Sequence, residues 1–181
     1  LDTTLRANRV TLSVDDGSLT LMGHATVDAR APAGGVVSLS ARDDLILQTN
    51  ASAATEGAGA QTGARILADS SREGANGGDV LLNATLGTVN VQAGVSLSAV
   101  GDADDSLDGR IVLRAGTDTS ALAAETVDYA KVVKVTIADA SGLKAGQVSV
   151  EAVQVYDSQD AGIIAEDGVY VYARTVQRHG A

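Results

Sequence analysis

Short segments in which hydrophobic and polar residues alternate recur along most of the chain. Five of them follow one order, which is glycine, any residue, apolar, any, apolar, any, alanine: 35–41, 78–84, 87–93, 109–115 and 146–152. A period of two is typical of a β-strand with one buried face. Valine, isoleucine and leucine fill most apolar positions and suit a pleated surface. We therefore predict one short strand in each unit.

Looser copies of this unit occur elsewhere. Segment 17–23 ends in glycine, segments 8–14 and 43–49 begin with asparagine or aspartate, and segment 167–173 has its glycine one place later. We interpret the first residue of each unit as a corner residue that adopts the left-handed backbone conformation. The closing alanine is expected where the strand turns inward and space is short.

The spacing of the units favours a coil. The strands near residues 80, 89 and 95 follow one another too closely for helical crossovers, which need about a dozen residues. Asp-Gly hairpin signals occur at 16–17, 108–109 and 167–168, which is too few for an up-and-down barrel. We predict an all-β fold, a parallel β-solenoid with about three short strands per turn. Turns of roughly 20–30 residues would give about six to eight turns.

Two stretches interrupt the pattern within a single predicted domain, 1–181. Residues 51–77 are rich in alanine, glycine, serine and threonine, and we expect an irregular coil that carries a loop insertion. Residues 120–125 have good helix propensity, so this stretch is either one short helix or a loop leaving the coil. Neither end has an obvious polar cap, although 174–181 could form a weak one, and open ends invite pairing with another chain.

The amino-acid composition excludes several classes of function. The chain has no cysteine, tryptophan or phenylalanine, so the core must be thin, and a disulfide scaffold or thiol nucleophile is excluded. Acidic residues outnumber basic ones 23 to 13, which argues against nucleic acid and anionic membranes as partners. Two histidines, His24 and His179, leave little room for a histidine-built metal site. No apolar run reaches the roughly 20 residues that cross a bilayer, and we expect no cofactor, metal or catalytic residue.

Segments 77–84, 87–99, 109–115 and 146–156 resemble the repeats of the filamentous haemagglutinin family, large bacterial exoproteins of two-partner secretion systems. The resemblance implies a right-handed parallel β-helix, a rod-shaped exported chain and a role in adhesion or surface filaments. The family's N-terminal secretion domain is not evident, so the resemblance implies a segment of a larger exported protein. The family has no fixed active site in such repeats, so no functional residue carries over.

Three tyrosines near the C-terminus are the candidate interaction surface. Tyr170 and Tyr172 alternate with Val169 and Val171, so both rings would project from one face if the valines face the core, and Tyr156 follows a similar pattern. Tyrosine is enriched at protein interfaces. Ordinary cross-strand stacking on a solvated sheet is the alternative interpretation.

The acidic residues give weaker signals. Segment 102–108 is the densest cluster and could bind calcium, but it has Leu107 and Leu113 where an EF-hand loop needs glycine and glutamate. A solvated loop is the favoured interpretation, and its calcium dependence stays open. Sugar-cleaving enzymes need two carboxylates at a defined separation. Glu151 is the outward acidic exception on the strands, and no second carboxylate is evident beside it.

These observations predict a structural protein rather than an enzyme. We expect a rod segment of a bacterial cell-surface or secreted adhesin that stacks end to end into an extracellular filament or matrix fibre. Its partners would be copies of itself and a glycan or protein on a host or neighbouring cell. The alternative is a carbohydrate-active β-helix, either a polysaccharide lyase or hydrolase or a glycan-binding module.

Overall fold

A computed structural model describes residues 1–50, 63–101, 107–118, 132–156 and 170–178, with side chains described up to Val153. The described residues form three β-sheets in which every pairing but one between named strands is parallel. The single described helix is a short 3-10 turn, η3 (Ala140–Gly142). The predicted all-β class with parallel strands is therefore confirmed.

From β1 to β14, each sheet collects every third strand of the chain, and β15 joins sheet B directly after β14. Sheet A contains β1 (Thr4–Arg6), β4 (Thr26–Asp28), β7 (Arg65–Leu67), β10 (Ser96–Ser98) and β13 (Leu143–Lys144). Sheet B contains β2 (Arg9–Val14), β5 (Val36–Ala41), β8 (Asp79–Ala84), β11 (Arg110–Gly116), β14 (Gln147–Tyr156) and β15 (Tyr170–Arg178). Sheet C contains β3 (Leu19–Leu21), β6 (Leu45–Leu47), β9 (Val89–Val91) and β12 (Val135–Ile137).

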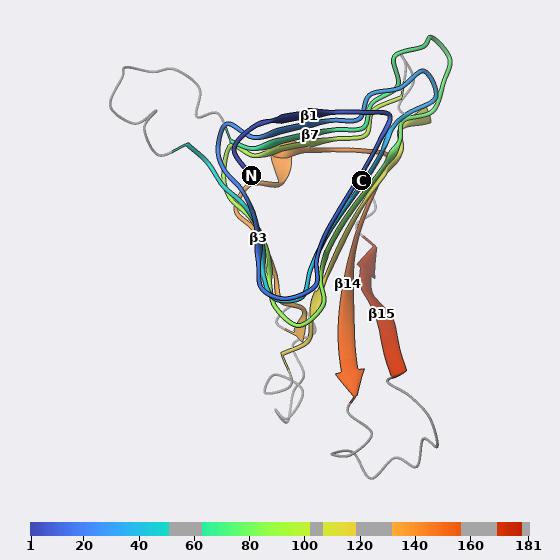
Figure 1. The fold of residues 1–181 in the computed structure, drawn as a ribbon. Coiled ribbons are helices and arrows are strands. Elements are labelled where there is room, and N and C mark those ends of the chain that lie inside the picture. The colour runs from blue at the N-terminus through green and yellow to red at the C-terminus, as the bar shows by residue number, and fades with distance from the viewer. Residues whose placement is uncertain (51–62, 102–106, 119–131, 157–169, 179–181) are drawn as a thin grey trace.

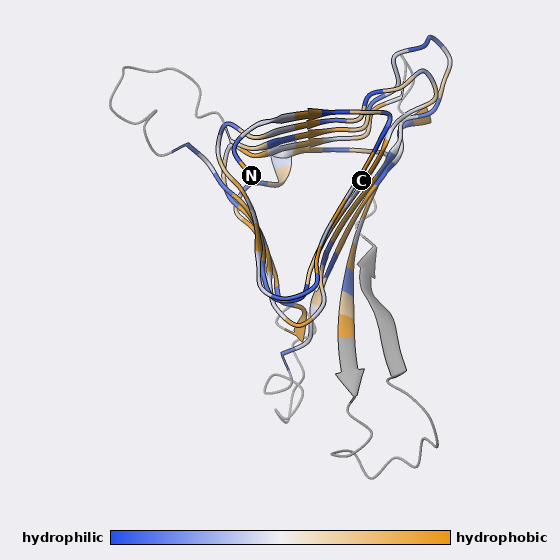
Figure 2. Cartoon of the chain, in the orientation of Figure 1, coloured by the Kyte–Doolittle hydropathy of each residue, from blue (hydrophilic) through white to orange (hydrophobic). Residues whose placement is uncertain are grey.

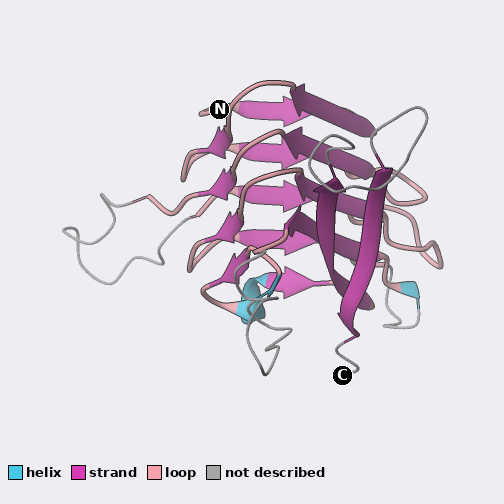
Figure 3. Ribbon diagram, turned by 90° about the horizontal axis from the view of Figure 1, so that it is seen from below, coloured by secondary structure: helices cyan, strands magenta, loops and turns pink. Residues whose placement is uncertain are grey.

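The chain passes through sheets B, C and A in turn and then begins the next circuit. Viewed along the stack, the three sheets form the sides of a triangle (Figure 1). Viewed from the side, successive circuits lie on top of one another (Figure 3). The described part of sheet B holds five parallel strands, fewer than the six to eight turns expected. Successive parallel strands of this sheet begin 27, 43, 31 and 37 residues apart (36 − 9, 79 − 36, 110 − 79 and 147 − 110), mostly more than the 20–30 residues predicted for a turn.

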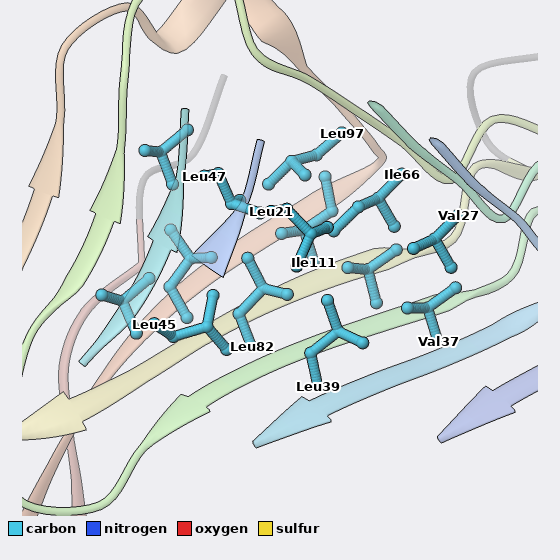
Figure 4. Packing of buried hydrophobic residues seen from close by; sticks show 14 of the residues in the cluster. Leu21, Val27, Val37, Leu39, Leu45, Leu47, Ile66, Leu82, Leu97 and Ile111 are labelled. Atoms are coloured by element: carbon cyan, nitrogen blue, oxygen red, sulfur yellow. The ribbon is translucent and has the colours of Figure 1, made fainter. Parts of the chain in front are cut away.

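Repeat positions align into columns that form the core. In sheet B the apolar columns run through Val37, Val80 and Ile111, and through Leu39, Leu82 and Leu113. All six side chains are buried, and Figure 4 shows leucine, isoleucine and valine side chains from several circuits converging between the sheets. The closing alanines of the four units in sheet B form a third buried column: Ala41, Ala84, Ala115 and Ala152. Figure 2 shows the hydrophilic corner between sheets B and C that follows this column.

At the start of the units in sheet B, the first glycine plays a different role from the one predicted, whereas Gly17, the first residue of the looser unit 17–23, has the predicted positive φ, +95°. Gly35, Gly78 and Gly109 do not have a positive φ; among the described glycines that angle occurs at 17, 34, 74 and 94. A Cβ on Gly78 would instead lie 1.9 Å from the carbonyl oxygen of Gly35, and a Cβ on Gly109 would lie 1.9 Å from that of Gly78. Gly78 and Gly109 thus let the backbones of successive circuits stack closely at the corner between sheets A and B. At the same corner a Cβ on Gly35 would lie 1.7 Å from the carbonyl oxygen of Ala29, in its own circuit.

Parts of the two interruptions lie outside the described residues. Within 51–77 the structure describes β7, whose Ile66 is fully buried in the core. Residues 51–62 of the predicted loop and the whole predicted helix at 120–125 lie outside the described ranges.

The C-terminal end of sheet B carries a strand that runs against the others. β15 pairs antiparallel with β14, from Tyr170 opposite Tyr156 to Arg178 opposite Ser149. The predicted weak cap at 174–181 thus overlaps a strand that covers the edge of β14. Its direction was not predicted.

Candidate functional site

The outward face of sheet B carries ion pairs between neighbouring circuits. Arg114 on β11 lies beside Glu151 on β14 in the register, and its Nε and Nη2 atoms approach Glu151 Oε2 to 2.8 and 2.6 Å. Both side chains are partly buried. Glu151, the outward carboxylate identified in the sequence, is therefore held by an arginine.

A second pair lies at the start of the same sheet. Arg110 Nε lies 2.7 Å from Asp79 Oδ1 on the adjacent strand, and both side chains are about half-exposed. Neither ion pair was predicted, although the sequence contains a signal for both. Arg114 and Glu151 occupy the sixth position of their units, and Asp79 and Arg110 occupy the second. Aligning the units would have placed these opposite charges side by side.

The most enclosed carboxylate described is Asp28, at the end of β4. Arg30 binds it through Nε and Nη2, both at 2.9 Å, and Arg6 Nε donates to it at 3.1 Å. The hydrogen bonds from Arg30 hold the pKa of Asp28 well below its ordinary value, against the opposing effect of burial. A carboxylate with both oxygens occupied by arginines stays ionised, so this cluster ties β1 to the corner after β4 rather than exchanging protons.

The three predicted interface tyrosines lie in the β14–β15 hairpin. Tyr156 pairs with Tyr170, and Tyr172 pairs with Gln154. The two strands thus bring together backbone positions that are 14 and 18 residues apart in the sequence. Their side chains lie outside those described, so the tyrosine surface stays a prediction.

The other sequence candidates give no cluster of ligands among the described residues. Residues 102–106 of the acidic segment and His179 lie outside them. Asp108 accepts a hydrogen bond from the Gly101 amide at 2.7 Å, and the His24 ring lies 2.8 Å from the Asn50 side-chain amide. Within the described ranges, no three histidine, cysteine, aspartate or glutamate residues are grouped to hold a metal.

Two open hollows mark the outer surface near the corners of the triangle. One is lined by Ser40, Arg42, Asn83 and Thr85 together with five neighbours, and the other lies around the Asp79–Arg110 pair. Both have mixed polar and apolar walls without an aromatic side chain. They can accept hydrogen-bonding groups of a surface ligand, but they do not enclose one.

No family model, curated protein or solved structure matches this chain. Among the described residues, no helix is long and apolar enough to span a membrane.

Proposed function

We propose that this chain is a rod segment of an exported bacterial adhesin, located at the cell surface or secreted. The observation that carries the proposal is the in-register stacking of equivalent repeat positions along one axis. Each core column continues from one circuit to the next, so the same unit can extend a rod by simple repetition. The resemblance of the units to filamentous haemagglutinin repeats supports the same function.

The handedness of the fold and its number of strands per circuit are also part of this proposal. We infer a right-handed parallel β-helix with three strands per circuit. Each connection from one strand of sheet B to the next passes through sheets C and A, and crossovers between parallel strands of one sheet are almost always right-handed.

The outer surface supports a binding role. Its strand positions carry polar residues and fixed ion pairs, and its two hollows are open to solvent. Such a surface suits recognition of a large ligand, either a glycan or a protein of a host or neighbouring cell. The tyrosine positions of the hairpin would add apolar contact area to that surface.

The experiment is a binding and turnover assay on the purified chain. Labelled protein is applied to cultured cells and to a panel of polysaccharides, and the polysaccharides are then analysed for cleavage, with and without calcium. We expect retention without cleavage. Cleavage would overturn the proposal in favour of the carbohydrate-active alternative, and failure to be retained on any surface would also contradict an adhesin.

A variant series tests the tyrosine surface within this assay. Replacing Tyr156, Tyr170 and Tyr172 with serine should reduce retention, whereas Tyr129→Ser, the matched change at the remaining tyrosine, should not. Equal retention by both variants would show that the hairpin tyrosines take no part in binding.

A further inference from the structure

The outward side of sheet A is basic, although the chain as a whole has a net charge of −10. One apolar residue of each strand packs into the core, and its neighbours in the strand point outward. Three of these outward residues, Arg6, Arg65 and Lys144, are exposed cations from the first, third and fifth strands of the sheet. The outward anion, Asp28, is buried.

Two more charged residues are bonded to side chains of this sheet. Arg30 binds Asp28, and Asp69 accepts a hydrogen bond from Ser98. The six charged residues together are named the basic face: Arg6, Asp28, Arg30, Arg65, Asp69 and Lys144. Four cations and two anions give it a net charge of +2 (4 − 2). All four cations are exposed and neither anion is, so the basic face presents positive charge to the solvent.

The corner between sheets B and C is acidic in the first two circuits. Asp15 and Asp16 lie between β2 and β3, and Arg42, Asp43 and Asp44 lie between β5 and β6. Four anions and one cation give this acidic corner a net charge of −3 (1 − 4). The two connections are stacked, because the Asp43 amide donates to the first connection at 3.0 Å. Figure 2 shows the hydrophilic residues that gather at this corner.

The acidic corner and the basic face lie on opposite sides of the triangular cross-section. Sheet A is the side of the triangle that faces the corner between sheets B and C (Figure 1). Moving a copy along the line from corner to face, without rotating it, therefore brings its acidic corner onto the basic face of the next copy. Both surfaces lie on the sides of the stack, so this contact leaves room for further circuits at either end of a rod.

We propose that a second copy of this chain docks its acidic corner on the basic face, so that rods associate side by side. Opposite charges favour the contact, and both surfaces are built from circuits that repeat about every 4.8 Å along parallel axes. Each copy uses its corner on one neighbour and its face on another, and a contact made by translation does not close. Association therefore gives rows of rods, and this goes beyond the proposed rod and adhesin function.

Sedimentation velocity of the full chain at increasing concentration tests the proposal. We expect a sedimentation coefficient that rises with concentration and does not level off at a dimer. In the face variant, Arg65→Glu/Lys144→Glu, the net charge of the basic face changes from +2 to −2 (2 − 4), while the bonds of Asp28 are kept. This variant should associate about tenfold more weakly or less.

The corner variant, Asp15→Lys/Asp43→Lys, makes the reciprocal change. It takes the net charge of the acidic corner from −3 to +1 (−3 + 4) and keeps the ion pair between Asp16 and Arg42. Alone it should also associate about tenfold more weakly or less. An equal mixture of the two variants should associate again, because the intact corner of the face variant meets the intact face of the corner variant. Restoration by mixing separates a lost contact from a lost fold.

Net charge alone predicts a different pattern. The face variant has a net charge of −14 (−10 − 4), and so has the control Arg9→Glu/Arg72→Glu, whose arginines are exposed outside the basic face. The control should associate clearly more strongly than the face variant. The corner variant has a net charge of −6 (−10 + 4), so lower overall repulsion would strengthen its association, whereas docking of the corner requires it to weaken.

Several results would overturn the proposal. These are a wild type that stays monomeric at every concentration, growth that stops at a dimer, and a mixture of the two variants that does not associate. A monomeric wild type that binds the acidic polysaccharide alginate, with binding lost in the face variant, would assign the basic face to a polysaccharide instead. Retention of the variants on cells is measured separately, so a loss of side-by-side association is distinguished from a failure of the adhesin function.

Discussion

Replacing Gly78 with alanine tests how the circuits stack. The added Cβ would lie 1.9 Å from the carbonyl oxygen of Gly35 and 2.5 Å from that of Ala68. Real Cβ atoms do not approach other heavy atoms closer than 3.0 Å, so the Gly35 contact must lengthen by at least about 1.1 Å. Both obstacles are backbone atoms, and relief of the clash must therefore separate neighbouring circuits.

The magnitude follows from the hydrogen bonds at this corner. The Gly78 amide donates to Ala68 at 3.0 Å, and the Asp79 amide donates to Gly35 at 2.9 Å. Each hydrogen bond contributes roughly 0.5–1.5 kcal/mol, and a buried donor left without its acceptor costs about 1–3 kcal/mol. Gly78→Ala should therefore lower the free energy of unfolding by at least about 3 kcal/mol.

Gly74→Ala is the matched control. Gly74 has a φ of +68°, but a Cβ there would meet no atom within 4 Å. Its replacement introduces only backbone strain, about 1–2 kcal/mol. The pair of variants thus separates the cost of lost space from the cost of a left-handed conformation.

Urea unfolding followed by far-ultraviolet circular dichroism measures both costs. With a slope of about 2 kcal/mol per M, Gly78→Ala should lower the midpoint by about 1.5 M or more, and Gly74→Ala by about 0.5–1 M. A loss for Gly78→Ala equal to or smaller than that for Gly74→Ala would refute close backbone stacking as the reason for this glycine.

Three further predictions concern the core and the ion pairs. Leu82→Ala, in the middle of its column, should lower the free energy of unfolding by about 3–5 kcal/mol. Leu12→Ala, in the first described strand of the same column, should lower it by clearly less. Equal losses of unfolding free energy, measured in urea, would contradict a stacked core. Asp28→Asn should cost about 1–3 kcal/mol at neutral pH. The pKa of Asp28 is lowered in the folded state, so the stability that its charge contributes is fully present above the ordinary aspartate pKa near 4. The difference in stability between wild type and Asp28→Asn should therefore shrink as the pH falls from about 5 towards 2. A difference in thermal stability that is independent of pH would argue against stabilisation of the Asp28 carboxylate by Arg6 and Arg30. Glu151→Gln removes the ion pair with Arg114 and should change the free energy of unfolding by roughly 1 kcal/mol or less. The variant should bind polysaccharide as the wild type does. If the wild type cleaves a polysaccharide and this variant does not, Glu151 would instead have a catalytic role.

The alternation of apolar and polar residues was sufficient to predict most of the core. Val80 and Leu82 are buried, and Asp79, Leu81 and Asn83 are not, as the period of two requires. The closing alanines of the four units in sheet B are buried as expected, because a small residue at a strand end indicates limited space whatever lies opposite. Ala93, the closing alanine of unit 87–93 in sheet C, is exposed, so there the prediction was wrong.

The role of the first glycine could not be obtained in the same way. A single unit shows that Gly78 lacks a side chain, but it does not show that the Gly35 carbonyl, 43 residues earlier, occupies the space. Glycine is compatible with a left-handed corner and with close packing, and only the stacking of the circuits distinguishes them.

The direction of β15 could not be predicted from the sequence for a related reason. The alternation in β15 is the same whether it pairs parallel or antiparallel with β14, because both arrangements place alternate residues on opposite faces. The ion pairs on sheet B could, in contrast, have been predicted from the sequence. Arg114 and Glu151, for example, occupy the same position in two units.

Equivalent repeat positions lie side by side in the parallel strands β5, β8 and β11. Nuclear Overhauser contacts between assigned methyl groups and backbone protons of these strands measure this arrangement. We expect contacts from Val80 to both Val37 and Ile111, with a parallel pattern of backbone contacts in the same register. Close contacts between α-protons across these strands, as in antiparallel sheets, or a Val80 that contacts neither partner, would contradict it.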